Sequence, residues 1–191
     1  MAWCHSQPVL ALVILLISAA FGAADQYVGS LAAHSWAVEV SLLSAPWLLL
    51  PLLAGATRRT AKSAAVLGFA ATLAALIGYG LMTLSPLEGA HLNMGTAVAF
   101  LRSEALVFIG GAVTGPLFGW LGQRWRTRGA IAGPLITVTA FCLEPLAHEF
   151  VPGGIAVSQR VALAEVIMGV AVALAGLLLH RRFIEVTQRL R

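Results

Sequence analysis

Carboxylates inside otherwise apolar stretches are the residues of this sequence that could do chemistry. The 191-residue chain has eight Asp and Glu residues. An ionisable side chain inside a bilayer is costly unless it is paired or hydrated, so it turns towards the interior of a helix bundle and is a functional candidate. Five acids from five separate apolar segments are therefore expected to converge in one sheltered pocket: Asp25, Glu39, Glu104, Glu144 and Glu165.

Aromatic side chains share helix faces with two of these acids. Residues three or four positions apart lie on the same face of a helix. One such face contains Trp36, Glu39 and Trp47, and another contains Phe141, Glu144 and His148. A further aromatic residue, Tyr79, is expected at a similar depth in the third span. We therefore expect acids to stand beside aromatic rings in the pocket.

This combination suits chemistry that passes through a positively charged intermediate. A desolvated carboxyl group can stay protonated and act as a general acid. A proton given to an alkene or an epoxide starts a carbocation cascade, which aromatic faces and carboxylates stabilise. We predict a membrane enzyme that cyclises a linear apolar chain entering from the bilayer, with Glu39 or Glu144 as proton donor and Asp25 and Glu165 as helpers or terminal base. The predicted substrate contacts are Trp36, Trp47, Tyr79, Phe141, His148 and Glu104.

Two other interpretations of the same acids remain open. In the first, they bind a ligand from outside, and the protein is the substrate-capturing subunit of a transporter or a small carrier. In the second, Arg102 and Arg160 neutralise Glu104 and Glu165 in structural ion pairs.

Motifs of the common enzyme classes are absent from the sequence. It contains no His-Glu-x-x-His helix, no Gly-x-Ser-x-Gly turn, no Cys-x-x-Cys pair and no phosphate-binding Gly-Lys-Ser/Thr loop. His34, His91 and His148 follow no known metal-ligand spacing. We therefore expect neither a metal nor a cofactor.

Composition places these residues in a membrane. Apolar residues make up 59% of the chain and charged residues 10%, and the mean hydropathy is +0.88. These values exclude a soluble enzyme, a nucleic-acid binder and a disordered tail. A helix needs about 20 apolar residues to cross a bilayer. We predict an all-α polytopic bundle, one transmembrane domain over residues 1–191, with six transmembrane helices at about 8–25, 36–56, 61–84, 103–122, 129–148 and 160–180 and a tail at 181–191.

The basic residues predict the orientation of this bundle. With six spans, most of them lie on the side of both chain ends: Arg58, Arg59, Lys62, Arg124, Arg126, Arg128, Arg181, Arg182, Arg189 and Arg191. The positive-inside rule then places both termini in the cytoplasm. Gly22-Ala23-Ala24 resembles a signal-peptide cleavage site, but no Lys or Arg precedes the first apolar segment, so we expect that span to be retained.

Small residues and prolines indicate how the spans pack. Gly111, Gly115 and Gly119 form a row that allows close helix approach, within the monomer or to a partner helix. Several prolines are expected to kink their helices, among them Pro46 in the second span. The segment 86–101 is too short and polar to span, and is expected to lie in the interface or to fold back over the pocket.

Several stretches carry a resemblance to a known group: Ala24-Asp25-Gln26-Tyr27, Leu43-Ser44-Ala45-Pro46-Trp47, Arg102-Ser103-Glu104, Gly115-Pro116-Leu117-Phe118-Gly119 and Cys142-Leu143-Glu144-Pro145. They resemble small six-span integral membrane proteins of GC-rich bacteria, which implies a place in the bacterial inner (cytoplasmic) membrane. In size and polarity the chain is also similar to noncanonical bacterial membrane terpene cyclases, which implies acid-initiated cyclisation of a linear prenyl (isoprenoid) substrate. It further resembles the substrate-binding subunits of energy-coupling-factor transporters, through its spans and through Ala20 and Ala24. The resemblance to the transporter subunits implies an outward-facing site and a cytoplasmic ATPase partner. The outer position of the acids favours it, because a prenylated intermediate would be made in the cytoplasm.

Overall fold

The computed structural model describes residues 6–91, 93–150 and 157–189. Every regular element in these ranges is helical, which confirms the predicted all-α class. The helices are α1 (Ser6–Gly29), α2 (Ser35–Ser41), α3 (Ala45–Ala56), α4 (Ala61–Thr83), α5 (Met94–Ser103), α6 (Ala105–Arg128), α7 (Ala132–Phe150) and α8 (Gln159–Arg189). A 3₁₀ turn, η2 (Pro86–Glu88), lies between α4 and α5.

Four stretches of these helices are long and apolar enough to cross a membrane: Gln7–Gly29, Ala61–Thr83, Ala105–Arg128 and Gln159–Leu177. A fifth candidate arises if α2 and α3, which meet at 47°, count as one broken span. Large apolar side chains such as Leu12 and Leu16 are exposed along α1, as a lipid-facing surface requires. The helices indicate a multi-pass membrane protein. The described residues give four or five candidate spans against the six predicted, and α7, which covers the predicted span at 129–148, is not among them.

The predicted second span at 36–56 is not one continuous helix. It divides into α2 and α3, with the break at residues 42–44. A proline ring clashes with the carbonyl four residues earlier and offers no N–H to the helix. For Pro46 that carbonyl belongs to Leu42, which directly follows the end of α2, while Pro46 itself stands in the first turn of α3, where a proline is tolerated. The prediction of a merely kinked helix was therefore wrong at this point.

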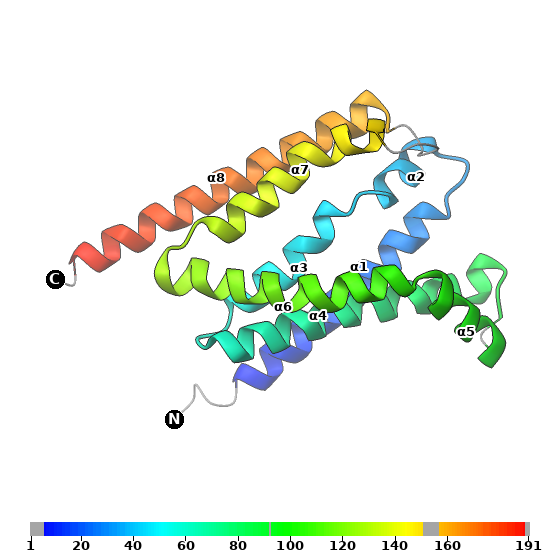
Figure 1. Cartoon of the computed structure of the whole chain (residues 1–191), viewed down its shortest axis with the longest axis horizontal. Helices are drawn as coiled ribbons and strands as arrows, with labels where there is room; N and C mark the ends of the chain where they lie inside the picture. Colours follow the sequence, from blue (N-terminus) through cyan, green and yellow to red (C-terminus); the bar gives the residue numbers. More distant parts are fainter. Residues whose placement is uncertain (1–5, 92, 151–156, 190–191) are drawn as a thin grey trace.

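The helices form two groups with the broken helix between them. Figure 1 shows α1, α4 and α6 together along one side and the long α7–α8 hairpin along the other, with α2 and α3 in the middle. In the first group, Gly22 and Gly78 let α1 and α4 approach closely. A Cβ at Gly22 would lie 1.9 Å from the backbone oxygen of Ala75, and one at Gly78 would lie 2.0 Å from that of Ala19. Only glycine fits at such contacts.

The glycine row of α6 packs within the chain. A Cβ at Gly119 would lie 2.4 Å from the backbone oxygen of Ala64, and Gly115 faces Gly68 and Thr72 on α4. Gly111, one turn earlier, approaches the Thr72 side chain. Of the two packing possibilities for this row, the structure therefore shows the contact with α4.

The segment at 86–101 forms η2 and most of α5, beside one end of the bundle (Figure 1). A capping box starts α5: the Asn93 side chain accepts the Thr96 backbone N–H at 3.0 Å, and the Thr96 hydroxyl accepts the Asn93 N–H at 3.0 Å. From α5, Phe100 packs against Gly80 and the Tyr79 ring. α5 thus lies against the end of α4.

Candidate ligand-binding pocket

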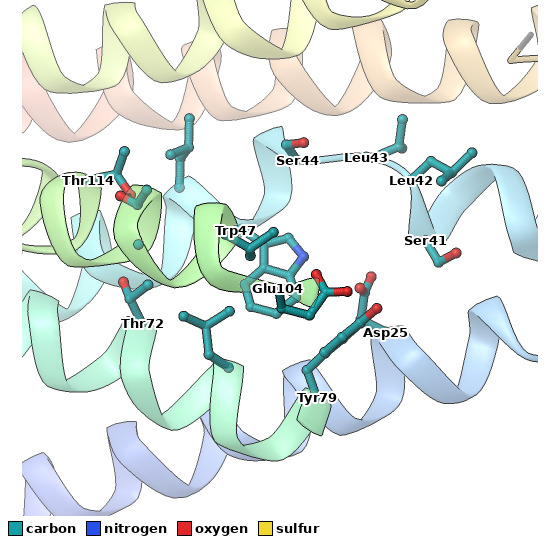
Figure 2. A pocket seen from close by; sticks show the side chains of 15 residues that line it. Asp25, Ser41, Leu42, Leu43, Ser44, Trp47, Thr72, Tyr79, Glu104 and Thr114 are labelled. Carbon is teal, nitrogen blue, oxygen red and sulfur yellow. The ribbon is translucent and has the colours of Figure 1, made fainter. Parts of the chain in front are cut away.

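A cavity of about 410 Å³ lies between α1, α4, α6 and the broken helix. Its polar and aromatic walls come from four places in the sequence: Asp25 on α1, Trp47 on α3, Tyr79 on α4, and Glu104 between α5 and α6. Figure 2 shows these four side chains gathered together, with Ser44 above them. The pocket therefore combines two carboxylates with an indole and a phenol.

Aromatic packing holds the rings of this pocket in place. The ring centroid of Trp47 lies 5.5 Å from that of Phe21 and 6.2 Å from that of Tyr79, both in edge-to-face geometry. Tyr79 in turn lies 6.2 Å from Phe100. The Trp47 indole also donates a hydrogen bond towards the Asp25 carboxyl group. The indole is thus fixed both by its ring contacts and by its polar edge.

The pocket carries an unbalanced negative charge. The charges of Asp25 and Glu104 both act on the Tyr79 side chain, which lies near the end of α4 beside these two acids. Among the described residues that line the cavity, none is Lys, Arg or His. The predicted ion pair of Arg102 with Glu104 does not form, and Arg102 is exposed at the end of α5.

The far wall of the cavity is mostly apolar and carries two hydroxyl groups. Thr72 on α4 and Thr114 on α6 lie at mid-helix, and Leu76 and Val107 line the space between them and the acids. Each hydroxyl donates to its own helix: Thr72 Oγ1 to the Gly68 carbonyl at 3.1 Å, and Thr114 Oγ1 to a carbonyl one turn earlier at 2.9 Å. Their oxygens can still accept a hydrogen bond from a ligand.

Glu144 lies outside this pocket and caps the start of α3. One carboxylate oxygen accepts the backbone N–H of Ser44 at 2.5 Å, and the other accepts that of Ala45 at 2.7 Å. The first N–H groups of a helix have no partner within it and attract negative charge. Glu144 on α7 therefore stabilises the second half of the broken helix.

Glu39 makes the reciprocal contact at the start of α8. Its Oε2 accepts the backbone N–H of Ser158, directly before α8, at 2.8 Å. The broken helix thus caps the α7–α8 hairpin through Glu39, and the hairpin caps the broken helix through Glu144. These two contacts together are called the capping junction below. Both were predicted proton donors, and both carboxylates accept backbone N–H groups here.

Glu165 lies beside Glu144 in the interior. Its side chain is 0% exposed, and neither of its oxygens has a hydrogen-bond partner among the residues that the structure describes. The predicted ion pair of Glu165 with Arg160 is therefore not formed. The neighbouring group that interacts with it is the Glu144 carboxyl.

The predicted site residues thus divide into separate groups instead of one. Asp25, Glu104, Trp47 and Tyr79 line the pocket, whereas Glu39, Glu144 and Glu165 lie at or beside the capping junction. Three further predicted residues are elsewhere: Trp36 is exposed beside His34, Phe141 is fully buried against Gly169, and the His148 side chain lies outside the described residues. The helix break explains why Trp36 and Trp47 share no face.

Sequence reasoning missed Ser44, Thr72 and Thr114 as pocket residues. For Thr72 a signal existed, because Thr72, Leu76 and Tyr79 follow one another at helical spacing on α4. Ser44 had no such signal, since it reaches the pocket only because the helix breaks there.

Comparison of the chain with protein-family models, with curated proteins and with solved structures finds no match. Within the described residues no group of three or more His, Cys, Asp or Glu side chains could hold a metal ion. The fold and the pocket therefore define the class: a multi-pass helical membrane protein with an acidic and aromatic cavity.

Proposed function

We propose that the protein is a small membrane carrier or substrate-capturing subunit whose pocket binds an organic cation. One observation carries this proposal: Asp25 and Glu104 share a cavity in which no described lining residue is basic. Two carboxylates in apolar surroundings repel each other and are poorly solvated. A bound cation relieves both costs.

The neighbours of the two acids favour an organic cation. Trp47 and Tyr79 present ring faces and edges beside the carboxylates. Aromatic faces attract alkylammonium groups, and most strongly where water is excluded. The cavity, about 410 Å³, has the size of a small-molecule site, and its far wall is apolar. The ligand we propose has a positively charged nitrogen near the acids and an apolar body reaching towards Thr72.

The orientation belongs to the same proposal: six spans, both termini in the cytoplasm and the pocket open to the outside of a bacterial inner membrane. In its support, α1 begins and α8 ends at one side of the bundle in Figure 1, where the α3–α4 connection with Arg58 and Arg59 also lies. Asp25 stands near the opposite end of α1. Ala20 and Ala24 are exposed on α1, where a partner helix could pack.

Binding of benzyltrimethylammonium to the purified protein in lipid nanodiscs, measured by isothermal titration calorimetry, tests the proposal. We expect saturable binding that Asp25→Asn and Glu104→Gln each weaken about tenfold or more, equivalent to about 1.4 kcal/mol. Glu185→Gln is the matched control, because it removes the same charge near the far end of α8. Absence of saturable binding, or equal losses in all three variants, would contradict the proposal.

A second candidate function is the acid-initiated cyclisation of an isoprenoid chain. It is favoured by the aromatic edge-to-face row of Phe21, Trp47 and Tyr79 beside two acids, because these groups would also stabilise a carbocation. Since Glu39 and Glu144 accept backbone N–H groups, the acid of this reaction would be Asp25 or Glu104.

Membranes that contain the protein, incubated with epoxy-isoprenoids, test this second function. A product of unchanged mass and new retention time, lost in Asp25→Asn or Glu104→Gln membranes, would establish the cyclase. Binding of benzyltrimethylammonium with complete recovery of the epoxide would instead leave the carrier as the function of this pocket.

A further inference from the structure

Glu165 is a polar side chain for which the described part of the chain provides no donor. It is 0% exposed in α8, and both of its oxygens are buried without a hydrogen-bond partner there. An unsatisfied buried carboxyl group is costly, and a buried ionised one more so. The polar group that interacts with it is another carboxyl group, that of Glu144.

The contacts of Glu144 show which of the two acids is suited to the charge. Both Glu144 oxygens accept backbone N–H groups at the start of α3, from Ser44 and Ala45. Such donors stabilise the ionised form. A carboxylate has no donor of its own, whereas a carboxylic acid has one O–H. A single proton on Glu165 would therefore allow its O–H to donate a hydrogen bond to Glu144.

We propose that Glu144 and Glu165 form a proton-binding site at the break between α2 and α3, with Glu165 protonated and donating to Glu144. The other titratable or charged residues with described side chains on this face are few. Cys142 lies on α7, Glu39 on α2, and Arg160 in the first turn of α8. The side chain of His148, one turn beyond Glu144 on α7, lies outside the described residues.

Release of this proton to water would act on the broken helix. It leaves two carboxylates side by side, which repel each other. Glu144 would then be pushed from Ser44 and Ala45, the residues that join the break to α3. Because Ser44 also lines the pocket (Figure 2), the proton and the pocket ligand would be coupled. This coupling rests on the proposed function, whereas the proton site itself does not.

Infrared spectroscopy of the protein in lipid nanodiscs tests the site directly. At neutral pH we expect a carbonyl band of a protonated carboxylic acid in the wild type. The band should be absent from Glu165→Gln, whose amide can donate to Glu144 in the same way and so preserve the fold. Glu39→Gln is the control and should retain the band, since it alters the other cap of the capping junction. A wild type without the band, or a Glu165→Gln spectrum that keeps it, overturns the proposal.

Calorimetry with benzyltrimethylammonium tests the coupling. As the pH rises above neutrality, the wild type should lose at least about threefold in affinity, and Glu165→Gln should lose none. Equal pH dependence in both proteins would overturn the coupling while the infrared result decides the proton site. If the ligand binds at no pH, the carrier proposal fails, and the infrared difference still decides the proton site.

Discussion

The pocket and the capping junction each contain two carboxylates, but the two regions use them in opposite ways. At the capping junction, Glu39 and Glu144 both accept backbone N–H groups at the starts of helices. In the pocket, Asp25 and Glu104 turn into a cavity, where the Trp47 indole is a donor to Asp25. The first pair holds elements together, and the second pair is left to meet a ligand.

The difference shows that depth in the membrane does not assign a role to an acid. All four carboxylates lie within apolar segments or at their ends, so the sequence alone does not distinguish their roles. What separates them is whether a backbone N–H at the start of a helix lies within reach. A carboxylate that accepts two backbone N–H groups is already stabilised, so a ligand gains little from it. One that faces an apolar cavity still needs a partner.

The largest expected effect is the loss of stability in Glu144→Ala, which removes the cap of the broken helix. The substitution leaves the N–H groups of Ser44 and Ala45 without their acceptor and removes the group beside Glu165. We expect the free energy of unfolding to fall by about 3 kcal/mol, since each hydrogen bond to a charged group contributes about 1.5 kcal/mol or more. Unfolding titrations with SDS measure it, and Glu185→Gln controls for the loss of charge. A fall below about 0.5 kcal/mol would show that the cap is dispensable.

In the pocket, Trp47→Phe should weaken ligand binding and lower the free energy of unfolding much less. The phenyl ring keeps the edge-to-face contacts with Phe21 and Tyr79, but the donor towards Asp25 is lost and the cation–π attraction weakens. We expect about a tenfold loss of affinity for benzyltrimethylammonium, or about 1.4 kcal/mol, by calorimetry. Trp36→Phe is the matched control, because Trp36 is 55% exposed and does not line the cavity. Equal losses in both variants would place the cation elsewhere.

The long helices could be predicted because a run of about 20 apolar residues is as long as a helix that crosses a membrane. The predictions at 8–25 and 61–84 agree with α1 and α4, apart from a few residues at the ends. The break in the second span could not be predicted, because Pro46 alone only weakens a helix. The break in this span is stabilised by Glu144, about a hundred residues away in the chain, and no local sequence pattern reveals that contact.

Part of the candidate site could also be predicted, from the positions of acids and aromatic residues within the apolar segments. Asp25, Trp47, Tyr79 and Glu104 were all expected near one another, and all four line the pocket, although their roles remain predictions. Helical spacing placed Glu39 with Trp36 and Trp47 on one face, and the break removed that common face. Whether an acid faces a cavity or a neighbouring helix start depends on tertiary contacts, which sequence spacing does not contain.

A smaller effect on stability is expected for Glu39→Gln. The amide oxygen can still accept the Ser158 N–H, but the negative charge at the start of α8 is lost. The free energy of unfolding should fall only slightly in SDS titrations, and by clearly less than in Glu144→Ala. Affinity for benzyltrimethylammonium should stay within about twofold of the wild type. A tenfold loss of affinity would instead bring Glu39 into the binding site and remove the distinction between the two regions.

The smallest effect is expected at the far wall of the pocket, in Thr72→Val. The hydroxyl already donates to the Gly68 carbonyl, so its removal leaves no buried donor unpaired and nearly preserves side-chain shape. If the apolar body of the ligand lies here, affinity for benzyltrimethylammonium should change by no more than about twofold, in either direction. Thr137→Val is the control, because Thr137 is also buried and donates to its own helix, but on α7 outside the pocket. A tenfold loss in Thr72→Val alone would mean that the trimethylammonium group lies against the Thr72 hydroxyl oxygen, so that the cation binds at the far wall and not beside the acids.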